Sequence, residues 1–163
     1  MLSLAAQLGQ TVQLGIWKNG CLIYIDQAFS SAPLSIIAPL YEPVQINTSA
    51  SAKVMLSLLP DAECQNALTT CGFHRLTDNT ITDKTAFMEE IKKSRFCGYG
   101  YDDEEFAVGI GCLAVPIYDG QKKCVGTLGI TGSIQEYRNK KKFKYMLSIL
   151  HDSASKIAQN LIQ

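Results

Sequence analysis

Two short turns, each set between apolar runs, most constrain how this chain can fold. Asn19-Gly20 separates TVQLGIW from CLIYID, and Asp119-Gly120 separates VGIGCLAVPIY from KCVGTLGITG. Asn-Gly and Asp-Gly favour positive φ angles, and a turn of that kind matches the twist of two antiparallel strands. The sequence therefore predicts two β-hairpins, and consecutive hairpins predict an antiparallel sheet.

Helical patterns occupy much of the remaining chain. Apolar spacing of three and four residues, with glycine or proline as stop signals, predicts helices over residues 2–8, 47–60, 61–72, 82–98 and 139–161. The last helix is amphipathic, with an apolar stripe of Phe143, Leu147, Leu150, Ala154, Ile157 and Leu161. Residues 35–46, which Pro39 and Pro43 interrupt, are predicted to be extended. Helices packed on one antiparallel sheet make an α+β domain.

Composition excludes several classes of protein. A chain of 163 residues that is 47% hydrophobic suits one globular domain, and a net charge of +0 gives no general attraction to nucleic acid or membrane. The six cysteines show no CxxC spacing, and neither histidine has zinc-ligand spacing to them, so no metal site is predicted. Scattered thiols, the lack of a signal peptide and the lack of an apolar run near ~18 residues predict a soluble, cytoplasmic protein.

The second hairpin presents one face of small residues. Thr127, Gly129 and Thr131 share a face of one strand, and Cys112, Ala114 and Pro116 share a face of its neighbour. Small side chains leave room either for a ligand pocket or for a closely packed helix. By themselves these residues favour the packing interpretation, because pockets are few in any domain.

The start of the helix at 47–60 is a second candidate site. Ala50, Ser51 and Ala52 leave its first N–H groups sterically open, and those groups carry the positive end of the helix dipole. A carboxylate or phosphate could bind there. The alternative is that Thr48 or Ser49 caps the helix and water satisfies the rest.

The stretch GYGYDDEEFAVGIGC, residues 98–112, carries four consecutive carboxylates, Asp102 to Glu105. Most runs of like charge are solvated, and this one matches neither a calcium loop nor a catalytic pair of acids. Asp102 or Asp103 could cap a short helical turn at Glu104 and Glu105. Cys112 lies in an apolar strand, where a free cysteine is more often a small hydrophobic residue than a nucleophile.

Read in order, these segments resemble the effector-binding domain of the IclR family, the isocitrate lyase regulator type of bacterial transcription factor. The segments that carry the resemblance are LAAQLGQTVQLGIWKNGCLIYID, TSASAKVMLSLLP, NTITDKTAFMEEIKKSRFCGYGYDDEEFAVGIGCLAVPIYD and GTLGITG. They cover nearly the whole chain with matching gaps. The resemblance implies a GAF-like fold, a pocket for a small-molecule effector that is often an acid, and dimers of dimers, so a homodimer or homotetramer. It also implies a winged helix-turn-helix DNA-binding domain upstream, which residues 1–163 do not contain, so that DNA is a partner through another domain.

The resemblance also implies pocket residues. These effector-binding positions are Asp102, Cys112, Gly129, Thr131, Ala50, Ser51, Ile36 and Val44. These positions include the small-residue strand face and the open helix start, so the resemblance favours a ligand pocket over close helix packing at both places. Gly129 lacks the hydroxyl often found at its position, Ala52 replaces a glycine and Asn47 replaces a histidine, so the effector preference is expected to be unusual.

The function predicted at this point is ligand sensing by a transcriptional regulator, a repressor in many such families, with no catalytic residue and no cofactor. The expected ligand is a small hydroxy acid or hydrated keto acid, with its carboxylate on the amides of Ala50 and Ser51 and a hydroxyl donated to Asp102. Three alternatives stay open. They are a GAF-like redox enzyme using a cysteine, a pure oligomerisation module using the 143–161 stripe, and metal binding by Cys112 and Asp102.

Overall fold

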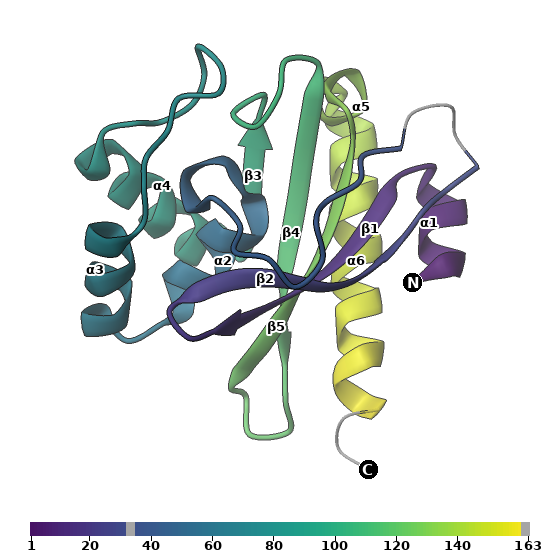
Figure 1. The fold of residues 1–163 in the computed structure, drawn as a ribbon. Helices are drawn as coiled ribbons and strands as arrows, with labels where there is room; N and C mark the ends of the chain where they lie inside the picture. The colour runs from purple at the N-terminus through teal and green to yellow at the C-terminus, as the bar shows by residue number, and fades with distance from the viewer. Residues whose placement is uncertain (32–34, 161–163) are drawn as a thin grey trace.

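The computed structural model describes residues 1–31 and 35–160. Its helices are α1 (Leu2–Leu8), α2 (Ala50–Leu58), α3 (Asp61–Thr70), α4 (Lys84–Cys97), α5 (Ile134–Arg138) and α6 (Lys140–Asn160), with a 3-10 turn at Ile46–Thr48. Its strands are β1 (Thr11–Lys18), β2 (Cys21–Ala28), β3 (Gly100–Asp103), β4 (Ile110–Tyr118) and β5 (Cys124–Ser133). In Figure 1, α2, α3 and α4 lie to the left of β4 and α1, α5 and α6 lie to its right.

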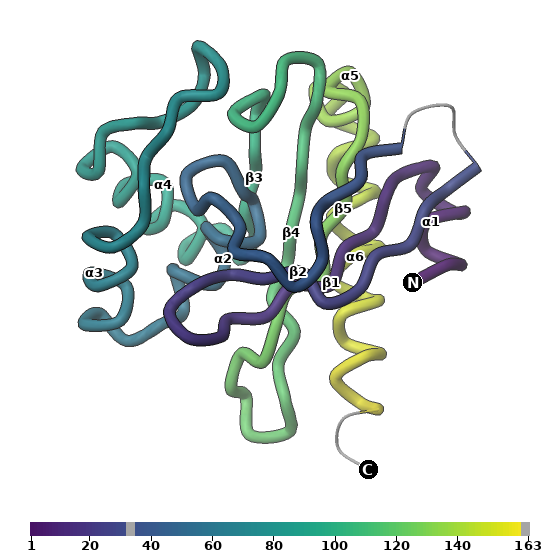
Figure 2. Tube along the Cα trace, in the orientation of Figure 1, coloured from purple at the N-terminus to yellow at the C-terminus, as the bar shows by residue number. Residues whose placement is uncertain are grey.

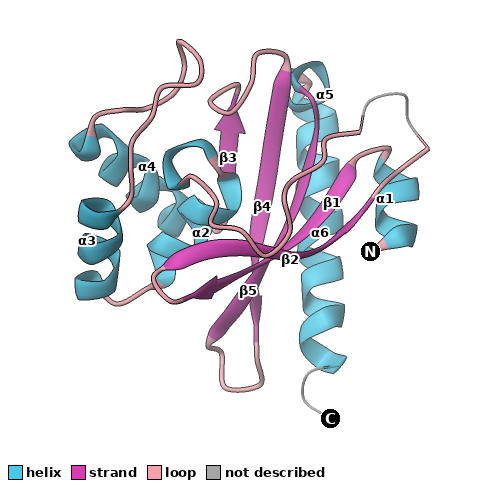
Figure 3. Cartoon of the chain, viewed as in Figure 1, coloured by secondary structure: helices cyan, strands magenta, loops and turns pink. Residues whose placement is uncertain are grey.

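The five strands form one antiparallel sheet in the order β2-β1-β5-β4-β3 (Figure 3). This confirms the predicted α+β class, a GAF-like antiparallel sheet flanked by helices. The first hairpin turns at Asn19 and Gly20, whose φ angles are 52° and 81°, as the sequence predicted. The second hairpin has a longer loop, in which the positive φ falls on Lys122 and the Asp119 carboxylate accepts hydrogen bonds from the amides of Gln121 and Lys123.

Two elements were not predicted from the sequence. The acidic run begins inside strand β3, where Asp102 pairs with Cys112 of β4, although the sequence suggested only a turn. Helix α5 precedes the long helix, which begins after the Asn139 side chain accepts hydrogen bonds from the amides of Lys141 and Lys142. The predicted end of that helix at Leu161 lies outside the described residues.

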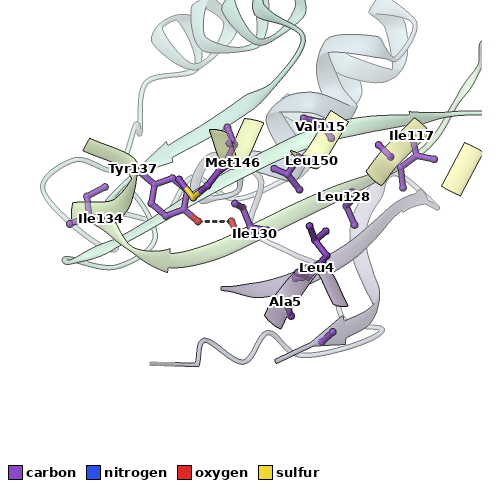
Figure 4. Close-up of a cluster of buried hydrophobic side chains, with 14 residues drawn as sticks. Leu4, Ala5, Val115, Ile117, Leu128, Ile130, Ile134, Tyr137, Met146 and Leu150 are labelled. Carbon is purple, nitrogen blue, oxygen red and sulfur yellow. Dashed lines mark hydrogen bonds between the residues drawn. The ribbon is translucent and has the colours of Figure 1, made fainter. Parts of the chain in front are cut away.

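One face of the sheet packs against α1, α5 and α6. Figure 4 shows its apolar cluster, in which Val115, Leu128 and Ile130 from the central strands meet Met146 and Leu150 of α6. The Tyr137 hydroxyl donates a hydrogen bond of 3.1 Å to the Ile130 carbonyl, so the ring is buried with its polar atom paired. Burial of these large side chains supplies most of the free energy that holds the helices to the sheet.

The other face of the sheet seats helix α2. The register places Gly129, Ala114 and Gly100 side by side across β5, β4 and β3. A Cβ atom on Gly100 would overlap the Ala50 carbonyl oxygen, and one on Gly129 would lie 3.2 Å from Ser51 Oγ. At these three positions the small residues therefore serve close helix packing.

Within residues 1–31 and 35–160, no helix combines the length and apolarity needed to cross a membrane.

The seating of α2 predicts unequal effects for two identical substitutions. Gly100→Ala is expected to destabilise the chain by about 2 kcal/mol or more, because the added methyl meets backbone that cannot turn away. Gly129→Ala serves as the matched control, and it is expected to cost under about 1 kcal/mol because the Ser51 hydroxyl can rotate. Urea unfolding measures both, and equal losses would contradict the proposed seating.

Candidate ligand-binding site

The sheet register brings polar residues from all five strands onto the face that α2 occupies. Residues that face each other across antiparallel strands project to the same side. One row across the sheet is Thr11, Thr131, Cys112 and Asp102. The next row is Gln27, Gln13, Gly129, Ala114 and Gly100. The small half of the second row lies under α2. At the polar end of the row Gln13 lines open space, whereas Gln27 is hydrogen-bonded to Ala38.

That open space is a cavity of about 300 Å³. Residues 36–45, which Figure 2 shows crossing in front of the sheet, form much of its wall together with Leu76 and Phe106. Its polar lining residues are Gln13, Tyr24, Glu42, Gln45, Thr48, Ser49, Cys112 and Thr131. Mostly apolar walls with a few polar groups are typical of small-molecule sites.

Sparse hydrogen bonds hold the covering segment to the sheet. The Gln27 side chain both donates to the Ala38 carbonyl at 3.0 Å and accepts from the Ala38 amide at 3.1 Å. The Ile36 amide donates to Thr11 Oγ1 at 3.2 Å, and the Val44 amide donates to the Leu22 carbonyl at 2.9 Å. The side-chain amide of Gln27 takes the place of a backbone partner on a neighbouring strand, because it supplies one donor and one acceptor.

A chain of hydrogen bonds runs along the cavity floor. Thr131 Oγ1 lies 3.0 Å from Gln13 Oε1 and 3.3 Å from Cys112 Sγ. The Cys112 thiol donates to Asp102 Oδ2 at 3.2 Å. Asp102 Oδ1 accepts from the amides of Glu105 at 2.7 Å and Phe106 at 3.4 Å. Asp102 therefore anchors the floor to the loop after β3, but the residues that it holds form bends and not the short helical turn that the sequence suggested.

The structure brings four of the predicted site residues to the cavity wall, namely Ile36, Val44, Cys112 and Thr131. The other four do not line it. Asp102 is fully buried behind Cys112, while Ala50 and Ser51 lie in the first turn of α2, where Ser51 contacts the position of Gly129.

The N-terminus of α2 reaches the cavity through its cap. Ser49 lines the cavity, and its hydroxyl accepts a hydrogen bond of 3.2 Å from the Ala52 amide. The Tyr24 hydroxyl lies 3.2 Å from the same oxygen, so Tyr24 and the helix cap form one polar corner.

Sequence reasoning missed the long polar residues of the floor. Gln13 stands in an otherwise apolar strand and is buried, and Tyr24 comes from the neighbouring strand. A polar residue on a strand that the pattern predicts to be buried was the available signal, since such groups require a partner. The pairing of β1 with β5, which carries Gln13 to Thr131, was not available from local pattern.

The sequence also misplaced Glu105, which it assigned to surface charge. Glu105 is 6% exposed, and its Oε1 lies 2.6 Å from the ammonium of Lys53, a fully buried residue of α2. Lys53 also donates to the Tyr101 carbonyl at 2.7 Å, and Glu90 lies 3.7 Å away. A buried cation determines which carboxylates of the run turn inward, because an unpaired buried charge is very costly.

Burial dominates the electrostatics of this cluster. It raises the pKa of Glu105 to about 7, with Lys53 acting in the opposite direction and Asp102 adding to the rise. Burial also raises the pKa of Asp102, against the hydrogen bonds from Cys112 and from the Glu105 amide. The pKa of the Cys112 thiol lies well above its ordinary value, first through burial and then through the Asp102 charge. Cys112 is therefore held as a thiol, which is the less nucleophilic form.

Comparison with known proteins identifies the family. A family model described as the bacterial transcriptional regulator IclR C-terminal domain matches residues 1–159. The chain belongs to the IclR family.

Relatives of this IclR domain are transcriptional regulators. The HTH-type transcriptional repressor AllR of Klebsiella pneumoniae is 29% identical over 132 residues, which are 81% of this chain and 48% of that protein. The crystal structure of the Thermotoga maritima IclR superimposes with a TM-score of 0.87 at 28% identity, over 98% of this chain and 64% of that chain. The chain spans about half the length of the curated relatives it matches.

A third similar structure is the inducer-binding domain of PobR from Acinetobacter, a double mutant in complex with 3-hydroxybenzoic acid. Its TM-score is 0.81 at 20% identity, over 96% of this chain and 94% of that chain. At that identity the similarity shows a shared fold.

The part of the chain that the structure describes holds no group of three or more histidine, cysteine, aspartate or glutamate side chains placed to bind a metal ion. All six cysteines are free thiols.

The buried ion pair predicts a non-additive pair of substitutions. Lys53→Met is expected to lower the free energy of unfolding by about 3–5 kcal/mol, because it leaves buried carboxylates without their cation. Lys53→Met combined with Glu105→Gln is expected to recover at least about 1 kcal/mol of that loss. Lys92→Met is the control, since its ion pair with Glu89 is exposed and should cost under about 0.5 kcal/mol. Additive losses in urea unfolding would contradict this role for Lys53.

Glu105 also predicts how stability depends on pH. Its pKa rises from 4.5 to about 7 in the folded chain, so the folded state holds the proton more tightly than the unfolded state. The contribution of Glu105 to the free energy of unfolding is therefore greatest below pH 4.5 and falls as the pH rises to about 7. Glu105→Gln, which stays neutral, is expected to gain stability relative to the native chain over that interval. A relative stability that does not change with pH, or that moves the other way, would rule this out.

Proposed function

We propose that this IclR domain is an effector sensor that binds a small acid in the cavity between the sheet and residues 36–45. The observation that carries the proposal is the cavity of about 300 Å³, with apolar walls and a floor of neutral hydrogen-bonding groups. Such a site suits a ligand with an apolar body and one polar end. The PobR inducer-binding domain, a protein of the same fold, is described in complex with 3-hydroxybenzoic acid, which supports an acid as the ligand class.

The polar end of the ligand would lie at the corner where α2 begins. Ser49 caps α2 and lines the cavity, and the positive end of the helix dipole favours a carboxylate there. The amides of Ala50 and Ser51 lie behind Ser49 and do not line the cavity, so in this proposal they favour the carboxylate through the helix dipole and not by direct contact. Thr131 and Cys112 would contact the ligand from the floor, and Ile36 and Val44 would pack on its apolar body.

Asp102 would act in this site mainly through Cys112. One of its oxygens holds the loop after β3 and the other accepts from the Cys112 thiol, so Asp102 fixes the cavity floor. A ligand hydroxyl could donate to Asp102 where Cys112 turns aside. Gly129 does not line the cavity, because Ser51 of α2 packs over it.

Binding would regulate DNA through the arrangement of subunits. A ligand shifts an equilibrium between two arrangements by the difference in its affinity for them. Because this chain matches about half the length of the curated relatives, and these are HTH-type repressors, DNA contact is assigned to another part of the protein. A homodimer or homotetramer of this domain would transmit the change.

The alternative functions find less support. A redox enzyme using Cys112 would need a thiolate, and the raised pKa opposes one. A pure oligomerisation module would be expected to have a filled interior, whereas Cys112 and Thr131 line a cavity.

Two measurements test the sensor. Native mass spectrometry of protein purified from cells is expected to show a bound acid small enough for the cavity. Calorimetry with that acid is expected to show about tenfold weaker binding to Thr131→Val, which keeps the side-chain shape and loses the hydroxyl. Thr85→Val, the same change on the exposed surface of α4, should bind like the native chain. Equal affinities for all three proteins would remove Thr131 from the site.

A further inference from the structure

We infer that Gln13 is the residue that sets which ligands the cavity accepts, by presenting its amide N–H groups to an acceptor oxygen of the effector. The inference rests on the proposed function and adds a specificity-determining residue that the sequence did not reveal.

Gln13 is a buried polar side chain that opens onto the cavity. It is 5% exposed and lines the cavity from the middle of β1. Its Oε1 accepts from Thr131 Oγ1 at 3.0 Å. Its Nε2 donates to no described residue, and it is not among the buried side-chain atoms shut away without a partner. The remaining accessible space beside this nitrogen is the cavity itself.

The neighbours of Gln13 explain why the amide can lie this way. Gly129 and Gln27 face Gln13 across the two adjacent strands. Gly129 has no side chain to compete for the space, so the amide can lean toward Thr131 in the adjoining row. Both ends of the Gln27 side-chain amide are hydrogen-bonded to the backbone of Ala38, so Gln27 does not compete with Gln13 for the cavity floor.

The distances along the hydrogen-bond chain agree with the orientation of the amide in the structure. Thr131 has one hydroxyl proton, and Gln13 Oε1 lies nearer to Thr131 Oγ1, at 3.0 Å, than Cys112 Sγ does, at 3.3 Å. The Cys112 thiol proton goes to Asp102. With the oxygen of Gln13 held by Thr131, the donors of the same amide point to the ligand. The lone pairs of Thr131 are then free to accept from a ligand hydroxyl.

Charge in the cavity makes this donor decisive. Among the described lining residues, Glu42 is the one with a carboxyl side chain, it is exposed, and none is a lysine, arginine or histidine. An acid in this cavity is therefore recognised by neutral donors rather than by lysine or arginine. A ligand that places a carboxylate or carbonyl oxygen at Gln13 satisfies the amide, whereas an amine in that place leaves two donors facing each other. The site accordingly selects acids, and among them those with a hydroxyl for Thr131.

Matched ligands and two variants test the inference. The ligands form two series, each with an acid, an amide and an amine on the same hydroxylated body. One series is lactate, lactamide and 1-amino-2-propanol, and the other is 3-hydroxybenzoate, 3-hydroxybenzamide and 3-hydroxybenzylamine. Calorimetry on the native chain is expected to rank acid above amide above amine. Gln13→Met, which has nearly the same shape, is expected to weaken binding of the acid about tenfold or more. Gln13→Glu keeps an acceptor for Thr131 and is expected to reverse the ranking so that the amine binds better than the acid.

Controls separate this inference from the proposed function. Gln121→Met changes an exposed glutamine in the β4–β5 loop and should leave every affinity unchanged. Thermal unfolding is measured to establish that each variant is folded. If Gln13→Met does not fold, the comparison of Gln13→Glu with the native chain decides the question. An acid that binds Gln13→Met or Gln13→Glu as tightly as the native chain would overturn the role of Gln13. If the native chain binds neither lactate nor 3-hydroxybenzoate, and no acid co-purifies with it from cells, the sensor function itself is overturned.

Discussion

The buried ammonium of Lys53 is the interaction on which the rest of this face of the molecule depends. It joins α2 to the β3–β4 loop through Glu105 and to β3 through the Tyr101 carbonyl. A charge taken fully out of water has to be compensated, so the loop is drawn inward at Glu105 and cannot be a solvated acidic turn. Asp102 then takes the two backbone amides of that loop and, through Cys112, holds the floor of the cavity. One cation therefore organises the helix, the loop and the cavity wall.

A single sheet face both seats a helix and lines a cavity because its side chains change size along each row. Gly100, Ala114 and Gly129 are small where α2 lies against the strands, and Gln13 and Gln27 are long where the helix no longer covers them. The two glutamines make different contacts. Gln27 holds residues 36–45 through the backbone of Ala38, and Gln13 bonds Thr131 and faces the cavity. The two interpretations that small residues allow, helix seat and pocket floor, are both realised a few ångströms apart.

In the proposed role of this IclR domain, the framework and the cavity floor are separate parts that can change independently. The Lys53 cluster and the glycine row belong to the framework, so changes there are expected to affect stability before affinity. The polar groups of the floor are neutral and come from separate strands, so each can change without breaking the ion pair behind them. The segment 36–45 is held to the sheet by hydrogen bonds at Ile36, Ala38, Tyr41 and Val44, and its apolar side chains form much of the cavity wall.

The sequence by itself determined the local elements. Short-range geometry specifies the first hairpin at Asn19-Gly20, the start of α2 at its Ser49 cap, and the last helix through the stripe that includes Phe143 and Leu150. The family resemblance supplied four residues that line the cavity. Only the tertiary structure decided the rest. Strand β3 and the inward turn of Glu105 depend on Lys53, about fifty residues earlier in the chain, and Gln13 meets Thr131 only because β1 pairs with β5. Pairing between distant strands and compensation of a buried charge are set by the whole fold, and so the chemistry of the site could not be read from neighbouring residues.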